Sequence, residues 1–368
     1  MKADTAPTTT VPNLTSRHIE TIEQASGILS AVLHPSKPTL FTASMDGGIQ
    51  SLDLNSQQKT LIGNHQSYAS GVVVGPTPDT LISAGYDGLL IWHDIENKHP
   101  IHVIEAHKFW SWRLAISPDQ KQVASCTGRY HSGGYRYEPA AESEPSIKIF
   151  DSVTGETTHE FEHTPPVTSL AFSPDSKFIA AGNLMGQIRI YELATSRLRA
   201  VWTTDAFTSW GIVKSHHYIG GIFDLAFTPE TSGLIACGMG PMRDPMAGNG
   251  KQTWQCFDWQ TEGTPLSREI EPNDAGKGLM ETLTIDPHNE RFVMAGRLAQ
   301  GQWNTAIFDT NTGTLLHSLN TKMRTTKALF TNKGDQLILC GAGSQKAPKN
   351  GKWPDFGKTH IYQLEFQS

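Results

Sequence analysis

The 368-residue chain contains no apolar stretch long enough to cross a membrane. A spanning helix needs about 20 consecutive, mostly apolar residues, and no such run occurs. The first residues, MKADTAPTTTVPN, also lack the apolar centre of a secretory signal. The sequence therefore predicts neither a membrane span nor a secretory signal, and we expect a cytoplasmic protein.

Cysteine is scarce, with four residues in the whole chain. Cys126, Cys237 and Cys340 each end a short apolar run, in QVASC, LIAC and LILC. Equivalent positions in separate structural units should lie too far apart for disulfide bonds. No two cysteines have the spacing of zinc ligands. We expect buried core cysteines in a reducing compartment, and no cofactor.

The chain also lacks an excess of positive charge, since Lys and Arg total 30, Asp and Glu total 36, and the formal net charge is -6. Nucleic-acid-binding domains are usually basic, so the composition argues against this class. Glycine and proline are abundant, at 33 and 21 residues, which indicates a structure with many turns.

One sequence element recurs along the chain: an apolar run, a turn rich in Pro, Asp or Asn, and a second apolar run. The turns begin at positions 34, 77, 117, 173, 228, 286 and 331 and read HPSK, TPDT, SPDQ, SPDS, TPET, DPHN and TNKG. Six have Pro in second place, where its fixed φ suits a type I turn. The recurrence predicts seven structural units, some lengthened by insertions.

The fourth unit shows the element without additions. VTSLAFSP, KFIAAGN, QIRIYEL and RLRAVW follow one another between residues 167 and 202. Their length and partial alternation are typical of antiparallel strands. Each unit is therefore predicted to be a four-stranded sheet.

Residues 64–95, NHQSYASGVVVGPTPDTLISAGYDGLLIWHDI, resemble a repeat of the WD-repeat β-propeller family. His65, Ser83, Asp87 and Trp92 match the structural hydrogen-bonding set of that family. The separation of 42 residues between His65 and His107 fits its period. The other third strands end in SLD, IFD, IYE, CFD, IFD and IYQ, so the repeats are divergent. The resemblance covers residues 17–366 and implies an all-β, seven-bladed propeller of four-stranded antiparallel blades.

The last unit ends at its third strand, THIYQLEF, and has no fourth strand of its own. Residues 17–24, RHIETIEQ, resemble the fourth strands of other units. We predict that this N-terminal strand closes the ring, which protects sheet edges from aggregation. The predicted organisation is a disordered tail at 1–16 and a single propeller at 17–368.

A serine, a histidine and an aspartate also suggest a hydrolase. The resemblance instead implies that His65, Ser83 and Asp87, together with Trp92, are structural. We further expect the third-strand aromatic residues Trp92, Phe150, Tyr191, Phe257 and Phe308 to lie in the core.

The insertions fall in connections that a propeller places on one face. Segments 127–145, 238–252, 296–304 and 341–358 join second to third strands, and 203–221 joins two blades. Insertions gathered on one face of a repeat array usually mark the binding face. Their aromatic and Arg content is typical of protein interfaces. The predicted partner-binding residues are Arg129, Tyr130, His131, Tyr135, Arg136, Tyr137, Trp210, His216, His217, Arg243, Arg297, Trp303, Lys352 and Trp353.

Basic residues near the seventh unit refine this expectation. Lys322, Arg324 and Lys327 lie close together in an otherwise acidic chain, which favours an acidic partner segment or another anion. The primary hypothesis is thus a non-catalytic scaffold that binds a protein or peptide. Trp110 and Trp112 are expected on the same face. Alternatively, the loop tyrosines and tryptophans pack together to hold the long loops against the ring.

Two other functions remain open. Loop residues of the types that bind Zn²⁺ favour a metal protein or enzyme, although neither HxH nor HExxH spacing occurs. They are His131, His216 and His217, with Glu138, Glu142 or Asp205. Basic aromatic loops could also bind nucleic acid or another polyanion. Glu138, Glu142 and Glu144 share one of those loops, which weakens that hypothesis.

Overall fold

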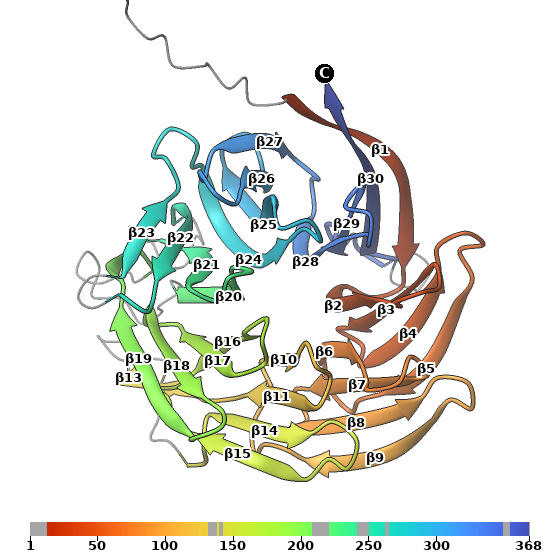
Figure 1. The fold of residues 1–368 in the computed structure, drawn as a ribbon. Coiled ribbons are helices and arrows are strands. Elements are labelled where there is room, and N and C mark those ends of the chain that lie inside the picture. The colour runs from red at the N-terminus through yellow and green to blue at the C-terminus, as the bar shows by residue number, and fades with distance from the viewer. Residues whose placement is uncertain are drawn as a thin grey trace, which may run out of the picture.

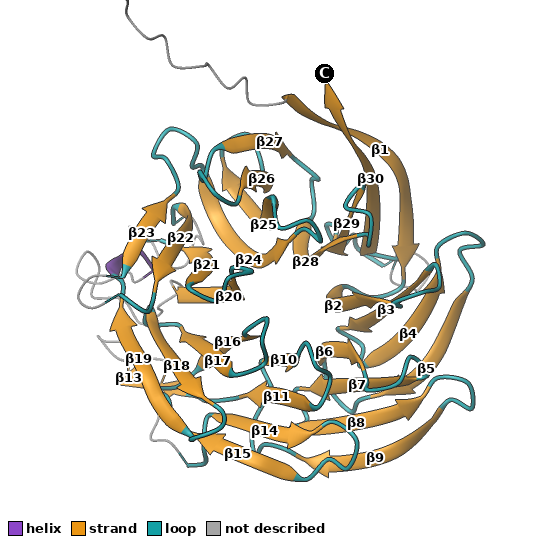
Figure 2. Ribbon diagram, viewed as in Figure 1, coloured by secondary structure: helices purple, strands orange, loops and turns teal. Residues whose placement is uncertain are grey.

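Seven four-stranded antiparallel sheets form a ring in the computed structural model of the chain (Figure 1). The structure describes residues 13–131, 138–139, 143–207, 221–240, 250–261, 265–348 and 354–367. The strands of each blade, a to d, run outward from the centre of the ring, and short loops join most of them (Figure 2). The predicted seven-bladed propeller is confirmed.

The first three blades contain strands close to the ideal length. The first contains β2 (Ile28–Leu33), β3 (Thr39–Ser44), β4 (Gly48–Asp53) and β5 (Lys59–Asn64). The second contains β6 (Ala69–Val74), β7 (Thr80–Gly85), β8 (Leu89–Asp94) and β9 (His99–Glu105). The third contains β10 (Arg113–Ile116), β11 (Gln122–Cys126), β14 (Ile147–Asp151) and β15 (Thr157–Phe161). A small hairpin, β12 (Tyr130–His131) and β13 (Glu138–Pro139), lies between β11 and β14.

The remaining blades complete the ring. The fourth contains β16 (Val167–Phe172), β17 (Phe178–Asn183), β18 (Gln187–Glu192) and β19 (Arg197–Thr203). A 3-10 turn follows at Asp205–Phe207. The fifth contains β20 (Gly221–Phe227), β21 (Gly233–Met239), β22 (Gln252–Asp258) and β23 (Leu266–Glu269). The sixth contains β24 (Lys277–Ile285), β25 (Arg291–Gln300), β26 (Thr305–Asp309) and β27 (Leu315–Leu319). The seventh contains β28 (Arg324–Phe330), β29 (Gln336–Ala342), β30 (Gly357–Gln367) and β1 (Asn13–Gln24).

The seven predicted turns join strands a and b, and each spans five residues between the strand ends. In the SPD turns, the hydroxyl of Ser117 donates to Asp119 at 2.6 Å and accepts the amide of Gln122 at 3.0 Å. Ser173 makes the equivalent bonds to Asp175 and Phe178. The side chains thus satisfy backbone groups at the point where the chain reverses.

The hydrophobic core lies between neighbouring blades. One of its clusters combines Ile82, Leu90 and Trp92 of the second blade with Val123 and Phe150 of the third. The third-strand aromatics are all buried, as predicted: Trp92, Phe150, Tyr191, Phe257 and Phe308. Because each sheet buries both faces against its neighbours, no blade can complete its core alone.

The predicted ring closure is confirmed. β1 pairs antiparallel with β30 from Asn13 opposite Gln367 to Gln24 opposite Gly357, with one irregularity (Figure 1). β1 begins before the predicted strand, so residues 13–16 belong to it, whereas residues 1–12 lie outside the described residues. Leu14 and Ile22 of β1 are buried, in two different inter-blade clusters. The first strand therefore seals the seventh blade and contributes to the core on both of its sides.

A buried hydrogen-bond network ties the second blade together. His65 Nδ1 lies 3.0 Å from Asp87 Oδ1, and His65 Nε2 lies 2.8 Å from Ser83 Oγ. The fourth member of the network is His93, whose Nε2 lies 2.8 Å from Ser83 Oγ. The expectation that Trp92 completes this set is corrected, because His93 follows it in the strand and points inward. Trp92 instead donates to the Ser152 carbonyl of the third blade at 2.7 Å.

The turn after Ser83 explains the Asp-Gly pair in the repeat. Asp87 accepts hydrogen bonds from the amides of Gln66 and Leu89. Gly88 has a φ of 79°, and a Cβ atom there would lie 2.1 Å from the His107 carbonyl oxygen. Glycine is therefore required where the turn touches the next blade.

The order Asp87–His65–Ser83 is also that of a hydrolase triad. Ser83, however, is completely buried, and its hydroxyl is held between two histidines. No substrate carbonyl can reach the oxygen in this arrangement, which agrees with the predicted structural role of the network.

The four cysteines are free and buried. Burial raises the pKa of Cys126 and of Cys340 to about 12, so both thiols are protonated at neutral pH and unreactive. Within the described ranges, no helix is long and apolar enough to cross a membrane.

Removing residues 1–24 should open the ring. A chain that begins at Ala25 lacks β1, which leaves the β30 edge unpaired and removes Leu14 and Ile22 from the core. We expect a large drop in the thermal unfolding temperature, with aggregation visible by size-exclusion chromatography. A chain that begins at Asn13 is the control and should unfold like the full chain. An Ala25 chain that stays monomeric and equally stable would contradict the closure.

His65→Ala should destabilise the protein by roughly 1–3 kcal/mol, because it leaves buried hydrogen-bonding groups on Ser83 and Asp87 without their partner. The measurement is the free energy of unfolding in denaturant. His99→Ala, at an exposed position of β9, is the control and should change it by less than about 0.5 kcal/mol. Equal stability of the two variants would refute a structural role for the network.

Candidate functional site at the channel mouth

Connection lengths differ sharply between the two faces of the ring. On one face, the long connections are 127–146, 204–220, 240–251 and 343–356. On the other face, no connection between strands exceeds seven residues. We call the first the loop face. The prediction that the insertions gather on one face therefore agrees with the topology for these four segments.

The fifth predicted loop, 296–304, is mostly strand. β25 continues to Gln300, and Arg297 lies opposite Leu279 of a lengthened β24. Arg297 is exposed. Trp303, expected on the surface, is only 5% exposed and donates to the Asp274 carbonyl at 2.9 Å. The structure places its indole in the core of the fifth and sixth blades.

A ring of seven side chains surrounds the opening of the channel on the loop face. Six of them occupy β-bulges, one in the first strand of each blade except the third. Each residue stands five positions before the turn between strands a and b. We call this set the mouth ring: Leu29, Ser70, Trp112, Thr168, Phe223, Glu281 and Thr326. A bulge redirects its side chain away from the sheet, here toward the channel.

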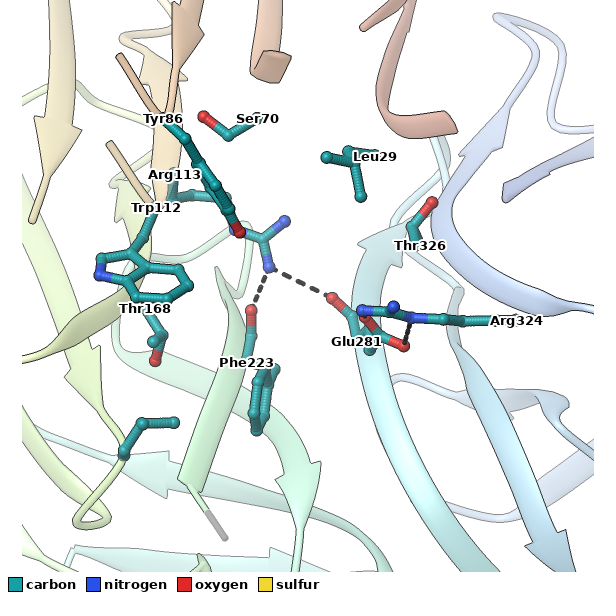
Figure 3. Close-up of a pocket in the computed structure, with 11 residues that line it drawn as sticks. Leu29, Ser70, Tyr86, Trp112, Arg113, Thr168, Phe223, Glu281, Arg324 and Thr326 are labelled. Atoms are coloured by element: carbon teal, nitrogen blue, oxygen red, sulfur yellow. Dashed lines mark hydrogen bonds and ion pairs between the residues drawn. The ribbon is translucent and has the colours of Figure 1, made fainter. Parts of the chain in front are cut away.

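The mouth ring encloses most of a cavity of about 320 Å³ (Figure 3). The wall also includes Tyr86 and Leu184 from the short turns between strands b and c, and Arg113 and Arg324. The lining therefore combines five apolar or aromatic side chains with three hydroxyl residues and three charged residues. Apolar walls with a few polar groups are typical of binding pockets. Sequence patterns did not reveal this ring. Six of its residues lie five positions before the turn motif of their blade, whereas Ser70 lies seven positions before its TPDT motif.

Two arginines at the mouth have different environments. Arg324 makes a bidentate ion pair with Glu281, with both N–O distances 2.7 Å. Arg113 donates through Nη2 to two carbonyls, that of Phe223 and, at 3.2 Å, that of Glu281. Among the described residues, Arg113 has no carboxylate within ion-pair distance, and its buried Nε has no hydrogen-bond partner.

Further charges lie deeper in the channel. Asp224 accepts the amides of Leu225 and Leu283 at 3.1 and 2.9 Å. Burial lowers the pKa of Lys327, although Asp224 partly opposes the shift. The basic residues predicted near the seventh blade thus separate: Arg324 lines the mouth, Lys327 lines the channel, and Lys322 is exposed at the surface.

An aromatic stack borders the mouth at the second and third blades. Tyr86 stacks on Trp110 at 4.6 Å between ring centroids, and Phe109 stacks on Trp110 at 4.8 Å. Arg129 lies over the Phe109 ring at 4.3 Å, and Tyr68 contacts Tyr86 at the other end. Because Arg129 begins the long connection 127–146, the stack fixes one end of that connection. This arrangement supports the alternative in which loop aromatics hold the loops against the ring.

Glu144 fixes the other end of the same connection. It accepts the Lys108 amide at 2.8 Å and the Lys148 ammonium at 3.0 Å, and His107 Nδ1 lies 3.8 Å away. Burial alone would raise the pKa of Glu144, but His107, Lys148 and the Lys108 amide lower it to about 2. Since His107 also contacts Ser125 at 3.0 Å, Glu144 occupies the role that Asp87 has in the second blade.

Most predicted partner-binding residues cannot be placed. Tyr130 and His131 form β12, of which only the backbone is described. The others lie outside the described residues: Tyr135, Arg136, Tyr137, Trp210, His216, His217, Arg243, Lys352 and Trp353. Of the six residues of the metal hypothesis, Glu142, His216 and His217 also lie outside the described residues, and only the backbone of His131 and Glu138 is described. In the part of the chain that is described, no group of three His, Cys, Asp or Glu residues could hold a metal ion.

Comparison with known sequences identifies one repeat directly. The model of the family "WD domain, G-beta repeat" matches residues 155–192. This segment holds the last strand of the third blade and the first three strands of the fourth. The sequence repeat is therefore offset by one strand from the structural blade, as the closure by β1 requires.

Three relatives share between 22% and 27% identity with the chain. WD repeat-containing protein SL1-17 of Schistosoma mansoni is 22% identical over 44% of this chain and 64% of its own length. Ribosome biogenesis protein ERB1 of Meyerozyma guilliermondii is 27% identical over 51% of this chain and 24% of its own length. Small ribosomal subunit protein RACK1y of Oryza sativa subsp. japonica is 24% identical over 44% of this chain and 46% of its own length.

Each match thus spans less than two thirds of the relative's own length. The matched repeat, these relatives and the seven-bladed ring agree in making the chain similar to the WD-repeat family of β-propellers.

Proposed function

We propose that this propeller is a non-catalytic interaction module that binds a protein or peptide over the channel mouth of the loop face. The observation that carries the proposal is the coincidence of two features on one face. The cavity opens inside the mouth ring, and the long connections leave the ring around it. Both ends of connection 127–146 are fixed by named contacts, so it can present side chains from a rigid base.

A protein partner fits this surface better than a nucleic acid. Single-stranded nucleic acids bind by stacking bases on exposed aromatic faces. Here Tyr86 and Phe109 already stack on Trp110, which leaves mainly its edge for a partner. The net charge of -6 also disfavours a polyanion.

The names of the relatives support a role in binding other proteins, without indicating a partner or a binding face. One is named for ribosome biogenesis and one for the small ribosomal subunit, and both names refer to assemblies of many components. We propose an analogous assembly role for this chain. The four free, buried cysteines fit a reducing compartment, which supports the cytoplasm as its location.

Loop side chains should supply the main energetic anchors. We propose Tyr135, Arg136, Trp210, Arg243 and Trp353, because buried aromatic and Arg residues dominate interface hot spots. Arg129 has a different role in this proposal, since its contact with the Phe109 ring holds the start of connection 127–146 against the propeller.

Replacing residues 131–141 with a short Gly/Asn turn should weaken partner binding strongly and preserve the fold. The exchange keeps Arg129 and Glu144, which fix the ends of the connection. Loss of hot-spot side chains worth about 2 kcal/mol or more should reduce recovery of native partners by roughly 30-fold. The measurement is affinity purification from the native organism with quantitative mass spectrometry, beside a thermal unfolding curve.

The matched control carries Lys121→Glu and Lys177→Glu in exposed turns of the opposite face. It should recover the same proteins as the unaltered chain. If the shortened variant folds and still recovers every partner, or if only the control loses them, the loop face is not the recognition surface.

A further inference from the structure

We propose that the channel mouth receives a carboxylate side chain of the bound partner, with Arg113 as its counter-ion. The inference rests on the proposed function, and it adds the chemistry of the residue that the partner inserts. Figure 3 shows the side chains of Arg113 and Tyr86 both reaching into the cavity.

Arg113 is the charged group at the mouth that has no charged partner among the described residues. Its guanidinium contacts only carbonyl oxygens, and its buried Nε is unpartnered within the described structure. A charge in a partly enclosed site is costly unless it is paired. A carboxylate could accept charge-assisted hydrogen bonds from the guanidinium, which are stronger than those to neutral acceptors.

The acidic groups nearby do not provide this pairing. Both oxygens of Glu281 are bound by Arg324, and Asp224 accepts two backbone amides deeper in the channel. Two guanidinium groups therefore face one carboxylate at the mouth, so an anionic group is attracted and a cationic one is repelled.

The rest of the lining suits the stem and the head of an acidic side chain. Trp112, Phe223 and Leu29 provide apolar walls for methylene groups. Burial raises the pKa of Tyr86, so its hydroxyl is neutral and can donate to a carboxylate. No hydrogen bond among the described residues uses this hydroxyl. Because the cavity is about 320 Å³, it admits a side chain, and the long connections would contact the flanking peptide.

A displayed library of random linear peptides provides the probe. Peptides selected on the full chain should carry Asp or Glu at one fixed position. Matched synthetic peptides, measured by fluorescence anisotropy, should then bind about tenfold or more weakly when that residue is changed to its amide, Asn or Gln.

Arg113→Gln should bind the acid and amide peptides equally. Arg113→Lys, which keeps the charge, should retain a reduced preference for the acid. Arg197→Gln, at an exposed position of β19, is the matched control and should keep the full preference. Thermal unfolding of each variant separates lost recognition from lost folding, and the Lys variant tests the idea if the Gln variant does not fold.

The possible outcomes separate this inference from the proposed function. If selected peptides require the 131–141 segment but show no acid preference, or if Arg113→Gln keeps that preference, the carboxylate site is refuted and the binding face stands. If no selected peptide depends on the loop face, the proposed function fails as well. If N-acetylglutamate α-amide, which keeps its side-chain carboxylate, binds as tightly as the selected acidic peptide or more tightly, the site belongs to a free small carboxylate. If a phosphoserine peptide binds much more tightly than the acidic peptide, the partner is phosphorylated. Either result would overturn the proposal.

Discussion

The antiparallel pairing of β1 with β30 is the interaction on which the rest of the structure depends. It joins segments from opposite ends of the chain and completes the one blade that neither end could form alone. Without it, the seventh sheet would expose an open edge, and two inter-blade clusters would lose Leu14 and Ile22. Only a closed ring brings all seven first strands to a common channel. The candidate site is therefore a consequence of closure as much as of the residues that line it.

The seven similar blades form the scaffold, and the different side chains at equivalent positions of their first strands determine the chemistry of the mouth. The bulge near the start of six first strands turns one residue of each blade toward the mouth. Ser70, Thr168 and Thr326 occupy three of these bulges, and their hydroxyls donate to backbone carbonyls. The Ser70 bond stays within its own blade, whereas the Thr168 and Thr326 bonds reach the next blade. Phe223 and Glu281, at two further bulges, and Trp112, which precedes the first strand of the third blade, give the opening apolar walls and a charge. Neighbouring Arg113 adds a guanidinium that forms no ion pair with any carboxylate of the described residues.

The architecture could be predicted from the sequence because it depends on local signals that repeat. The turns rich in Pro, Asp or Asn mark the first two strands of every blade, and the missing last strand implies a closing strand near the N-terminus. Details of the site depend on contacts between distant residues. His93 replaces Trp92 in the buried network, and Glu144 reaches back to His107 across an insertion. Arg297 and Trp303 were misplaced because a lengthened hairpin and a core tryptophan resemble a decorated loop in sequence.

The central claim is that recognition takes place at the channel mouth of the loop face. Hydrogen–deuterium exchange, with and without a peptide selected on the full chain, tests it directly. Recognition at the mouth should slow exchange at residues 112–113, in turn 184–186 and near Glu281, with no change in the turns 117–121 and 173–177 of the opposite face. Protection of the opposite-face turns, with unchanged exchange at the mouth, would contradict it.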